Sequence, residues 1–206
     1  MATIIAAAAE PALNDARALM RAFVAWHRAA HPEDAHRIDS YFDAAAFERS
    51  LASLPGEFGP PGGGLVVAYR DGRAAGCCAF RRLDDATCEM KRMFIPPAFR
   101  GLGIGRALAD RILADAKAAG YRRMRLETSV RQTDAIRLYE RAGFRPIPAY
   151  NPAPPELADW LVSFERALEP SFDGRREPTN ASRRGAPAAG FGSLTGLSTR
   201  NAPARA

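Results

Sequence analysis

The chain has 206 residues, 47% of them hydrophobic, and six more basic than acidic residues. That length suits one ordinary globular domain with a substantial core and a single functional site. Four of the six net charges come from residues 171–206, which hold six arginines and two acidic residues, so the basic balance does not mark the rest of the chain as a nucleic-acid binder.

The first third of the sequence predicts a strand followed by two helices. Residues 3–9 are apolar, follow no basic segment and are too short to cross a membrane, so we expect a strand there, with no signal sequence and no membrane partner. Apolar residues at helical spacing over 11–26 predict the first helix. A polar break over 31–39 and a second helix over 43–54 follow, and the prolines and glycines of 55–64 indicate a loop.

Three strands are predicted next, over residues 65–69, 74–82 and 87–95. Asp71-Gly72 between the first two is typical of a hairpin turn, and Pro96 and Pro97 end the third strand because proline cannot donate to a strand ladder. Cys77, Cys78 and Cys88 fall in these strands without a Cys-x-x-Cys pair or a nearby histidine. We therefore expect no disulfide and no metal site, and a reducing cytoplasm as the location.

Helical spacing returns from Gly103 and ends near Gly120, and alternation over residues 122–128 predicts another strand. A short helix over 135–142 and strands over 144–150 and 160–168 complete the pattern. This order predicts an α+β fold with a mixed sheet and helices on its faces. Residues 169–206, rich in Gly, Ala, Pro and Arg, are expected to form a disordered basic tail after a domain of residues 1–168, and a nucleic-acid role stays open for this tail alone.

The strongest motif lies between the strand ending near Ile95 and the helix that runs to residue 119. Glycines let backbone N–H groups converge on an anion, and a helix N-terminus adds unpaired N–H groups, so a pyrophosphate suits this turn. A Walker loop is excluded because no lysine follows the glycines. A dinucleotide fingerprint fits poorly, since Arg106 takes the place of the third glycine and five residues separate Ile95 from Gly101. The motif residues are Arg100, Gly101, Leu102, Gly103, Ile104, Gly105, Arg106 and Ala107.

Two blocks, residues 90–105 and 135–144, resemble the motifs of the GNAT acyltransferases, the first of them the acetyl-CoA-binding signature Arg/Gln-x-x-Gly-x-Gly/Ala. The resemblance covers about residues 1–168 and implies a mostly antiparallel central sheet with helices on both faces, and acetyl-CoA as co-substrate. It implies that residues 100–107 hold the pyrophosphate and that the backbone of Met93, Phe94 and Ile95 pairs with the pantetheine arm. Relatives often carry Asn where Gln132 stands, which leaves a cofactor contact by Gln132 open.

Amide formation from a thioester needs a base for the amine, a donor for the oxyanion and an acid for the sulfur. The resemblance implies Tyr139 as the acid and the N–H near Met93 or Phe94 as the oxyanion donor. Glu89 is the first candidate for the base and Glu127 the second, with deprotonation by solvent as the alternative. Cys88 is not expected to act as a nucleophile, and His27, His31 and His36 are expected at the surface.

The sequence therefore predicts an N-acetyltransferase acting on a primary amine of a small molecule or peptide. A non-catalytic acyl-CoA-binding regulatory module is the alternative. The acceptor and the oligomeric state stay open, a homodimer included.

Overall fold

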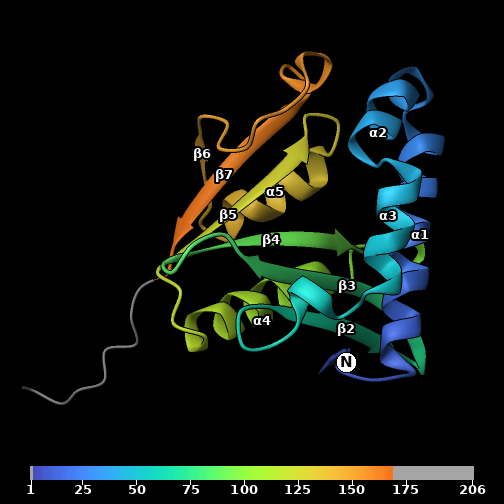
Figure 1. Ribbon diagram of the computed structural model, residues 1–206. Coiled ribbons are helices and arrows are strands. Elements are labelled where there is room, and N and C mark those ends of the chain that lie inside the picture. The colour runs from blue at the N-terminus through green and yellow to red at the C-terminus, as the bar shows by residue number, and fades with distance from the viewer. Residues whose placement is uncertain (1, 169–206) are drawn as a thin grey trace, which may run out of the picture. The chain divides into compact units, whose positions relative to one another are not determined.

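Figure 1 shows the computed structural model of the chain, in which residues 2–168 are described. The predicted tail of residues 169–206 lies outside them. Seven strands form one sheet in the order β1-β2-β3-β4-β5-β7-β6. Their bounds are β1 Thr3–Ala6, β2 Gly64–Arg70, β3 Arg73–Arg82, β4 Thr87–Phe94, β5 Arg123–Ser129, β6 Arg145–Ile147 and β7 Leu161–Ala167.

The helices of the described residues fall into two sets along the chain. One set lies between β1 and β2, and the other follows β4 and β5. Their bounds are α1 Ala12–Ala30, α2 Ala35–Tyr41, α3 Ala44–Ala52, α4 Ile104–Ala118 and α5 Thr133–Arg141. Short 3-10 turns at Pro32–Asp34, Gly56–Phe58, Pro97–Phe99 and Pro155–Leu157 join the elements. No helix of the described part is long and apolar enough to cross a membrane.

Neighbouring strands are antiparallel throughout the sheet except for β4 and β5, which run parallel. The predicted mixed, mostly antiparallel sheet is thus confirmed. The predicted hairpin is also present: Arg70 pairs with Arg73. The turn residues Asp71 and Gly72 have φ of 51° and 73°, the left-handed backbone that a two-residue hairpin requires.

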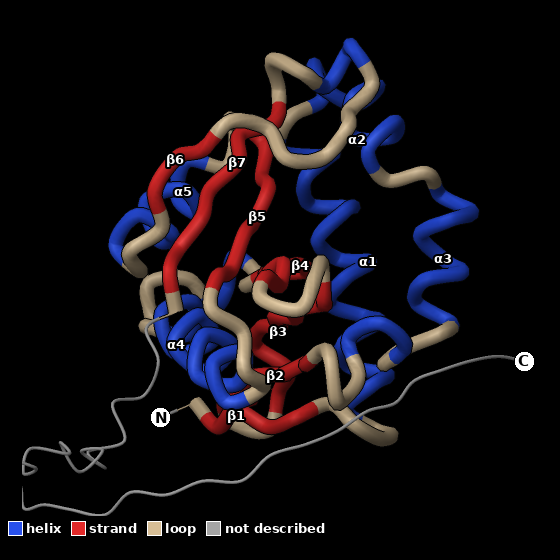
Figure 2. The backbone as a smooth tube through the Cα atoms, turned by 60° about the vertical axis from the view of Figure 1, so that its left-hand side comes forward, coloured by secondary structure: helices blue, strands red, loops and turns tan. Residues whose placement is uncertain are grey.

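Both faces of the sheet are buried, which explains why β2 reads as a continuous apolar run. Val66 and Ala68 belong to the core on the side of α4 and α5, whereas Leu65 and Val67 belong to the core under α1 and α3. Figure 2 shows these two pairs of helices on opposite sides of the strands. The predicted helices on both faces are therefore confirmed.

The structure corrects several boundaries. The first strand ends at Ala6 rather than at residue 9, and the first helix continues to Ala30 rather than ending at residue 26. The polar break predicted over 31–39 is largely helical, because α2 anchors one apolar residue, Ile38, in a cluster with Leu157 and Trp160. The strand predicted over 144–150 is only Arg145–Ile147, since Pro148 cannot extend a ladder. The final strand begins at Leu161, and Trp160 belongs to the preceding turn.

Candidate active site

Two glycines shape the turn between β4 and α4. Gly101 and Gly103 have φ of 75° and 77°, and a Cβ placed on either would meet no heavy atom within 4 Å. Gly103 caps α4, so the first backbone N–H groups of this helix point outward without partners inside the helix. Only a residue without a Cβ adopts this backbone at little cost, which leaves an open cradle of N–H groups for an anion.

The turn borders a cleft of about 610 Å³, which also lies against α1, the end of β4 and α5. Trp26 on α1 faces Arg100, whose guanidinium lies 4.2 Å from the indole centre and donates to the Ile95 carbonyl at 3.1 Å. Asp134 is the one acidic residue among the residues that line the cleft. Its basic lining residues are Arg100, Arg106, Arg131, Arg137 and Arg141. Arg106, Arg131 and Arg137 form salt bridges with Asp110, Asp34 and Asp134, whereas Arg100 and Arg141 have none among residues 2–168. The remaining positive charge suits a ligand with phosphates.

Most of the predicted cofactor residues lie along this cleft. Met93 and Phe94 line it from β4, Ile95 just after β4 and Gln132 just before α5, and the turn residues line it with two exceptions. The exceptions are Leu102, whose side chain is 47% exposed, and Ala107, whose N–H bonds to the Gly103 carbonyl at 3.1 Å.

The cleft opens where β4 and β5 part. The two strands pair only from Thr87 to Glu89 on β4, and beyond that point no β5 residue faces β4. A bulge reinforces the parting: the register with β3 shifts between Cys77 and Ala79, and Arg92 has φ of 59°. The backbone of β4 beyond Glu89 is consequently free of pairing with β5, as a strand edge is.

A second, smaller cavity of about 70 Å³ lies between the parted strands. Glu127 and Tyr139 both line it, as do Lys91 and Arg92. Phe23, Met93 and Gln132 line both this cavity and the cleft, so the two are adjacent.

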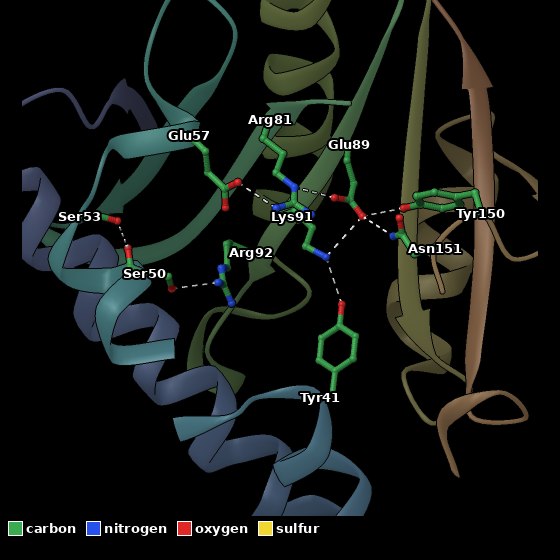
Figure 3. A network of polar contacts seen from close by, with 10 residues as sticks. All are labelled: Tyr41, Ser50, Ser53, Glu57, Arg81, Glu89, Lys91, Arg92, Tyr150 and Asn151. Atoms are coloured by element: carbon green, nitrogen blue, oxygen red, sulfur yellow. Dashed lines mark hydrogen bonds and ion pairs between the residues drawn. The ribbon is translucent and has the colours of Figure 1, made fainter. Parts of the chain in front are cut away.

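Glu89, the first candidate for the base, is 0% exposed and fully occupied by polar partners. Its carboxylate accepts from Arg81 Nε at 2.8 Å, Tyr150 OH at 2.7 Å and Asn151 Nδ2 at 3.3 Å. Lys91 Nζ lies 3.4 Å away and also contacts Tyr41 OH at 3.2 Å (Figure 3). Burial raises the pKa of Glu89, but Lys91, Tyr150 and Arg81 together lower it below its ordinary value.

Glu127, the second candidate, has the opposite surroundings. It is half-buried on β5, lines the cavity, and accepts one hydrogen bond, from Asn151 Nδ2 at 3.3 Å. Burial is the main cause that raises its pKa above the ordinary value, with Glu89 adding to the shift. Asn151 donates to both carboxylates. Of the two, Glu89 forms salt bridges with Arg81 and Lys91, whereas Glu127 forms none with any of residues 2–168.

Tyr139, the candidate acid, lies on α5 and is 6% exposed, with its ring edge-on to Phe144. Burial raises its pKa, so the hydroxyl keeps its proton at neutral pH. Cys88 is also buried, and burial raises the pKa of its thiol to about 12, so it carries no thiolate. The three cysteines are free.

His27 was expected at the surface, but it is buried, with 1% of its surface exposed. Its ring stacks on Trp160 at 5.6 Å and on Phe23 at 5.6 Å. Nδ1 lies 3.5 Å from Gln132 Nε2, whereas Nε2 is buried without a hydrogen-bond partner among the described residues. Burial is the main cause that lowers the pKa of His27 to about 4, so the imidazole is neutral. Trp160 and Gln132 lie more than 100 residues from His27 in the sequence, so no local pattern indicates these contacts.

Comparison with known proteins agrees with the fold and the motifs. Residues 16–144 match the acetyltransferase (GNAT) family. The chain is 42% identical over 97 residues to the IAA acetyltransferase of Azospirillum brasilense, covering 45% of this chain and 63% of that protein. It is 40% identical over 87 residues to the N-acetylaspartate synthetase of Rattus norvegicus, covering 42% and 29%. The chain thus spans less than two thirds of the length of these relatives.

Among solved structures, the fold is similar to that of the PaiA N-acetyltransferase of Thermoplasma acidophilum in complex with coenzyme A, with a TM-score of 0.62. The identity is 15%, and the match covers 81% of this chain and 99% of that one. Because the family match extends over more than half of the sequence, the chain belongs to the GNAT acetyltransferase family.

Proposed function

We propose that the chain is an N-acetyltransferase that transfers an acetyl group from acetyl-CoA to a primary amine of a small molecule or peptide by direct attack in a ternary complex. The acetyltransferase domain would span residues 1–168. The adjacency of the arginine-lined cleft and the polar cavity between β4 and β5 carries this proposal. An acyl donor in the cleft and an amine in the cavity would come together beside the residues that line both.

The cleft has the groups that coenzyme A requires. The N–H groups at the start of α4 would hold the pyrophosphate, with the glycine turn giving the approach that a Cβ would block. Arginines lining the cleft would neutralise the phosphates. The edge of β4 at Met93 and Phe94, with Ile95 just beyond it, would bond the amides of the pantetheine arm. Gln132, which lines both the cleft and the cavity, would contact the thioester end.

Glu127 is the better base of the two carboxylates. A base must be free to accept a proton, and Glu89 is held by four donors in a buried network. The raised pKa of Glu127 makes it a stronger base than an ordinary carboxylate, and it lines the cavity. Glu89 would instead position Tyr150 and Asn151, the second of which bonds Glu127.

The remaining steps fall to β4 and α5. As the amine nitrogen forms its bond to the acetyl carbon, Glu127 takes the amine proton directly or through water. The N–H of Met93 or Phe94 donates to the oxyanion, and Tyr139 gives its proton to the sulfur as the C–S bond breaks. Proton exchange with solvent then restores both side chains.

An amine-panel assay that follows free thiol from acetyl-CoA tests the proposal. The protein should release thiol with at least one amine and yield the acetylated amine by mass. Tyr139→Phe should lower kcat by about 100-fold while the Kd for CoA stays unchanged. Tyr121→Phe is the matched control, since that buried hydroxyl donates to the Gly62 carbonyl away from both cavities and its loss should leave kcat unchanged.

One outcome would contradict the proposal as a whole, and another would contradict only the role of Tyr139. Tight CoA binding without thiol release from any amine would favour a non-catalytic acyl-CoA-binding module. An unchanged kcat in Tyr139→Phe would remove the tyrosine from the reaction and leave the release of the sulfur to solvent.

A further inference from the structure

Arg92 stands in an unusual backbone position on β4. Apart from Asp71 in the hairpin turn, it is the only non-glycine residue with positive φ among residues 2–168. A left-handed backbone costs a residue with a Cβ about 1–2 kcal/mol, so the position is kept at a cost to stability. The bulge sets Arg92 out of register with β3 and turns it toward α3, beside the cavity between the parted strands.

The guanidinium of Arg92 has few partners. One nitrogen, Nη2, donates to Ser50 Oγ at 3.2 Å, and the group lies 5.0 Å from the centre of the Phe47 ring. Nε is buried without a hydrogen-bond partner, and within the described residues no carboxylate lies within ion-pair distance of Arg92.

The neighbouring cations differ in this respect. Arg81 is shared between Glu57 and Glu89, each at 2.8 Å, and Lys91 lies 3.4 Å from Glu89. Figure 3 shows Glu89 in contact with both of them, while Arg92 points away toward Ser50. The negative charge of Glu89 is therefore already balanced by Arg81 and Lys91. The positive charge of Arg92 has no acidic partner within ion-pair distance among residues 2–168.

A largely buried cation without an anion is unfavourable, and proteins rarely keep one unless something pairs with it. Burial, which disfavours the charged form, lowers the pKa of Arg92 below its ordinary value. The cavity that Arg92 lines has Lys91 on the same strand and Glu127 on β5 across the opening. The positive side chains that line this cavity therefore come from β4, and the negative one comes from β5.

We propose that Arg92 binds the carboxylate of the acceptor, which is therefore a small amino acid whose amine faces Glu127. The two Nη groups at the end of a guanidinium match the two oxygens of a carboxylate, and in Arg92 only Nη2 has a hydrogen-bond partner within the described residues, Ser50 Oγ. Lys91 lines the same cavity and attracts the acceptor carboxylate while it keeps its ion pair with Glu89. This inference rests on the proposed acetyl transfer and narrows its acceptor.

The test compares amino acids with their carboxamides, which keep the amine and remove the negative charge. At saturating acetyl-CoA, the wild-type chain should show a kcat/KM at least about 100-fold higher for the preferred amino acid than for its amide. Arg92→Gln should raise the KM for the amino acid by about 100-fold and change the KM for the amide by less than about threefold. Arg92→Lys should fall between them because it keeps the charge but loses the planar fork.

Arg49→Gln is the matched control, since it removes an exposed cation from α3 outside the cavity and should leave both KM values unchanged. The Kd for CoA should be the same in all variants. Equal use of amino acids and amides by the wild-type chain would overturn the inference while leaving acetyl transfer intact. An equal loss with both acceptors in Arg92→Gln and Arg92→Lys would also overturn it, as a purely structural role. Absence of thiol release from every amine would instead contradict the proposed function itself.

Discussion

Two carboxylates on adjacent strands, Glu89 and Glu127, have opposite electrostatic surroundings although Asn151 donates to both. Cations and a tyrosine hydroxyl hold Glu89 ionised, whereas burial works against the charge on Glu127. The first arrangement stabilises the fold, and the second gives a carboxylate ready to accept a proton at some cost in stability.

Replacing Glu127 with Gln should therefore separate activity from stability. We expect kcat at pH 7 to fall about 100-fold, and the decline in rate at low pH to disappear with the carboxylate. Because the pKa of Glu127 is raised in the folded chain, its ionisation lowers stability above the ordinary pKa of 4.5. Glu127→Gln should hence unfold at a higher temperature than the wild-type chain near neutral pH, and the difference should vanish below pH 4.5.

Glu89→Gln is the informative control for this experiment. Its pKa is lowered, so the stability that it contributes is present above the ordinary value and is lost as the pH falls through the folded pKa. Removing the charge of Glu89 leaves Arg81 and Lys91 without this ion-pair partner, which should lower the free energy of unfolding by about 3–5 kcal/mol. A Glu127 variant with unchanged kcat, and a Glu89 variant that folds normally but is inactive, would reverse the two roles.

At the level of residues, the sequence identified the candidates but could not rank them. Glu89 and Glu127 occur on predicted strands, yet what separates them is a set of donors to Glu89 alone. One of these, Tyr150, comes from an irregular loop. The sequence did not single out Arg92, because the feature that distinguishes it is the lack of an acidic partner among the described residues. His27 was misplaced because its burial depends on Trp160. Each of these depends on contacts between distant residues.

The glycine turn before α4 is an element whose purpose can be tested by a pair of substitutions. Gly103→Ala places a Cβ in the proposed pyrophosphate cradle without touching the protein, since no heavy atom lies within 4 Å. The left-handed backbone should cost about 1 kcal/mol of stability. The Kd for CoA, measured by calorimetry, should rise more than about tenfold, since backbone donors to an anion would be blocked.

Gly72→Ala in the hairpin between β2 and β3 is the matched variant, with φ of 73° and no heavy atom within 4 Å. It should lose a similar amount of stability and bind CoA as the wild-type chain does. Equal affinity in the two variants would show that the turn at Gly103 is a structural feature only.

Element by element, the strong local signals sufficed for most of the sheet. The Asp71-Gly72 turn and the glycine that caps α4 require particular backbone angles, so the sequence there has few alternatives. By contrast, α2 has a single buried apolar residue, Ile38, and the buried residues in its cluster, Leu157 and Trp160, come from beyond residue 150. The parting of β4 from β5 leaves no local pattern in the sequence, because the register between two parallel strands depends on residues far apart in the chain.

The sheet as a whole consists of two parts joined by a short seam. Strands β1 to β4 form one part and β5, β7 and β6 the other, and only three residue pairs link them. Beyond Glu89 the two strands do not pair, and the smaller cavity lies between them. This arrangement brings α4 and α5, from different parts of the sequence, to the two sides of one cleft.

A crystal structure of the chain with bound CoA tests this account most directly. We predict the pyrophosphate on the N–H groups at the start of α4, the pantetheine arm along Met93, Phe94 and Ile95, and the sulfur beside Tyr139. CoA at another place on the protein, or no CoA in crystals grown with it, would contradict the account.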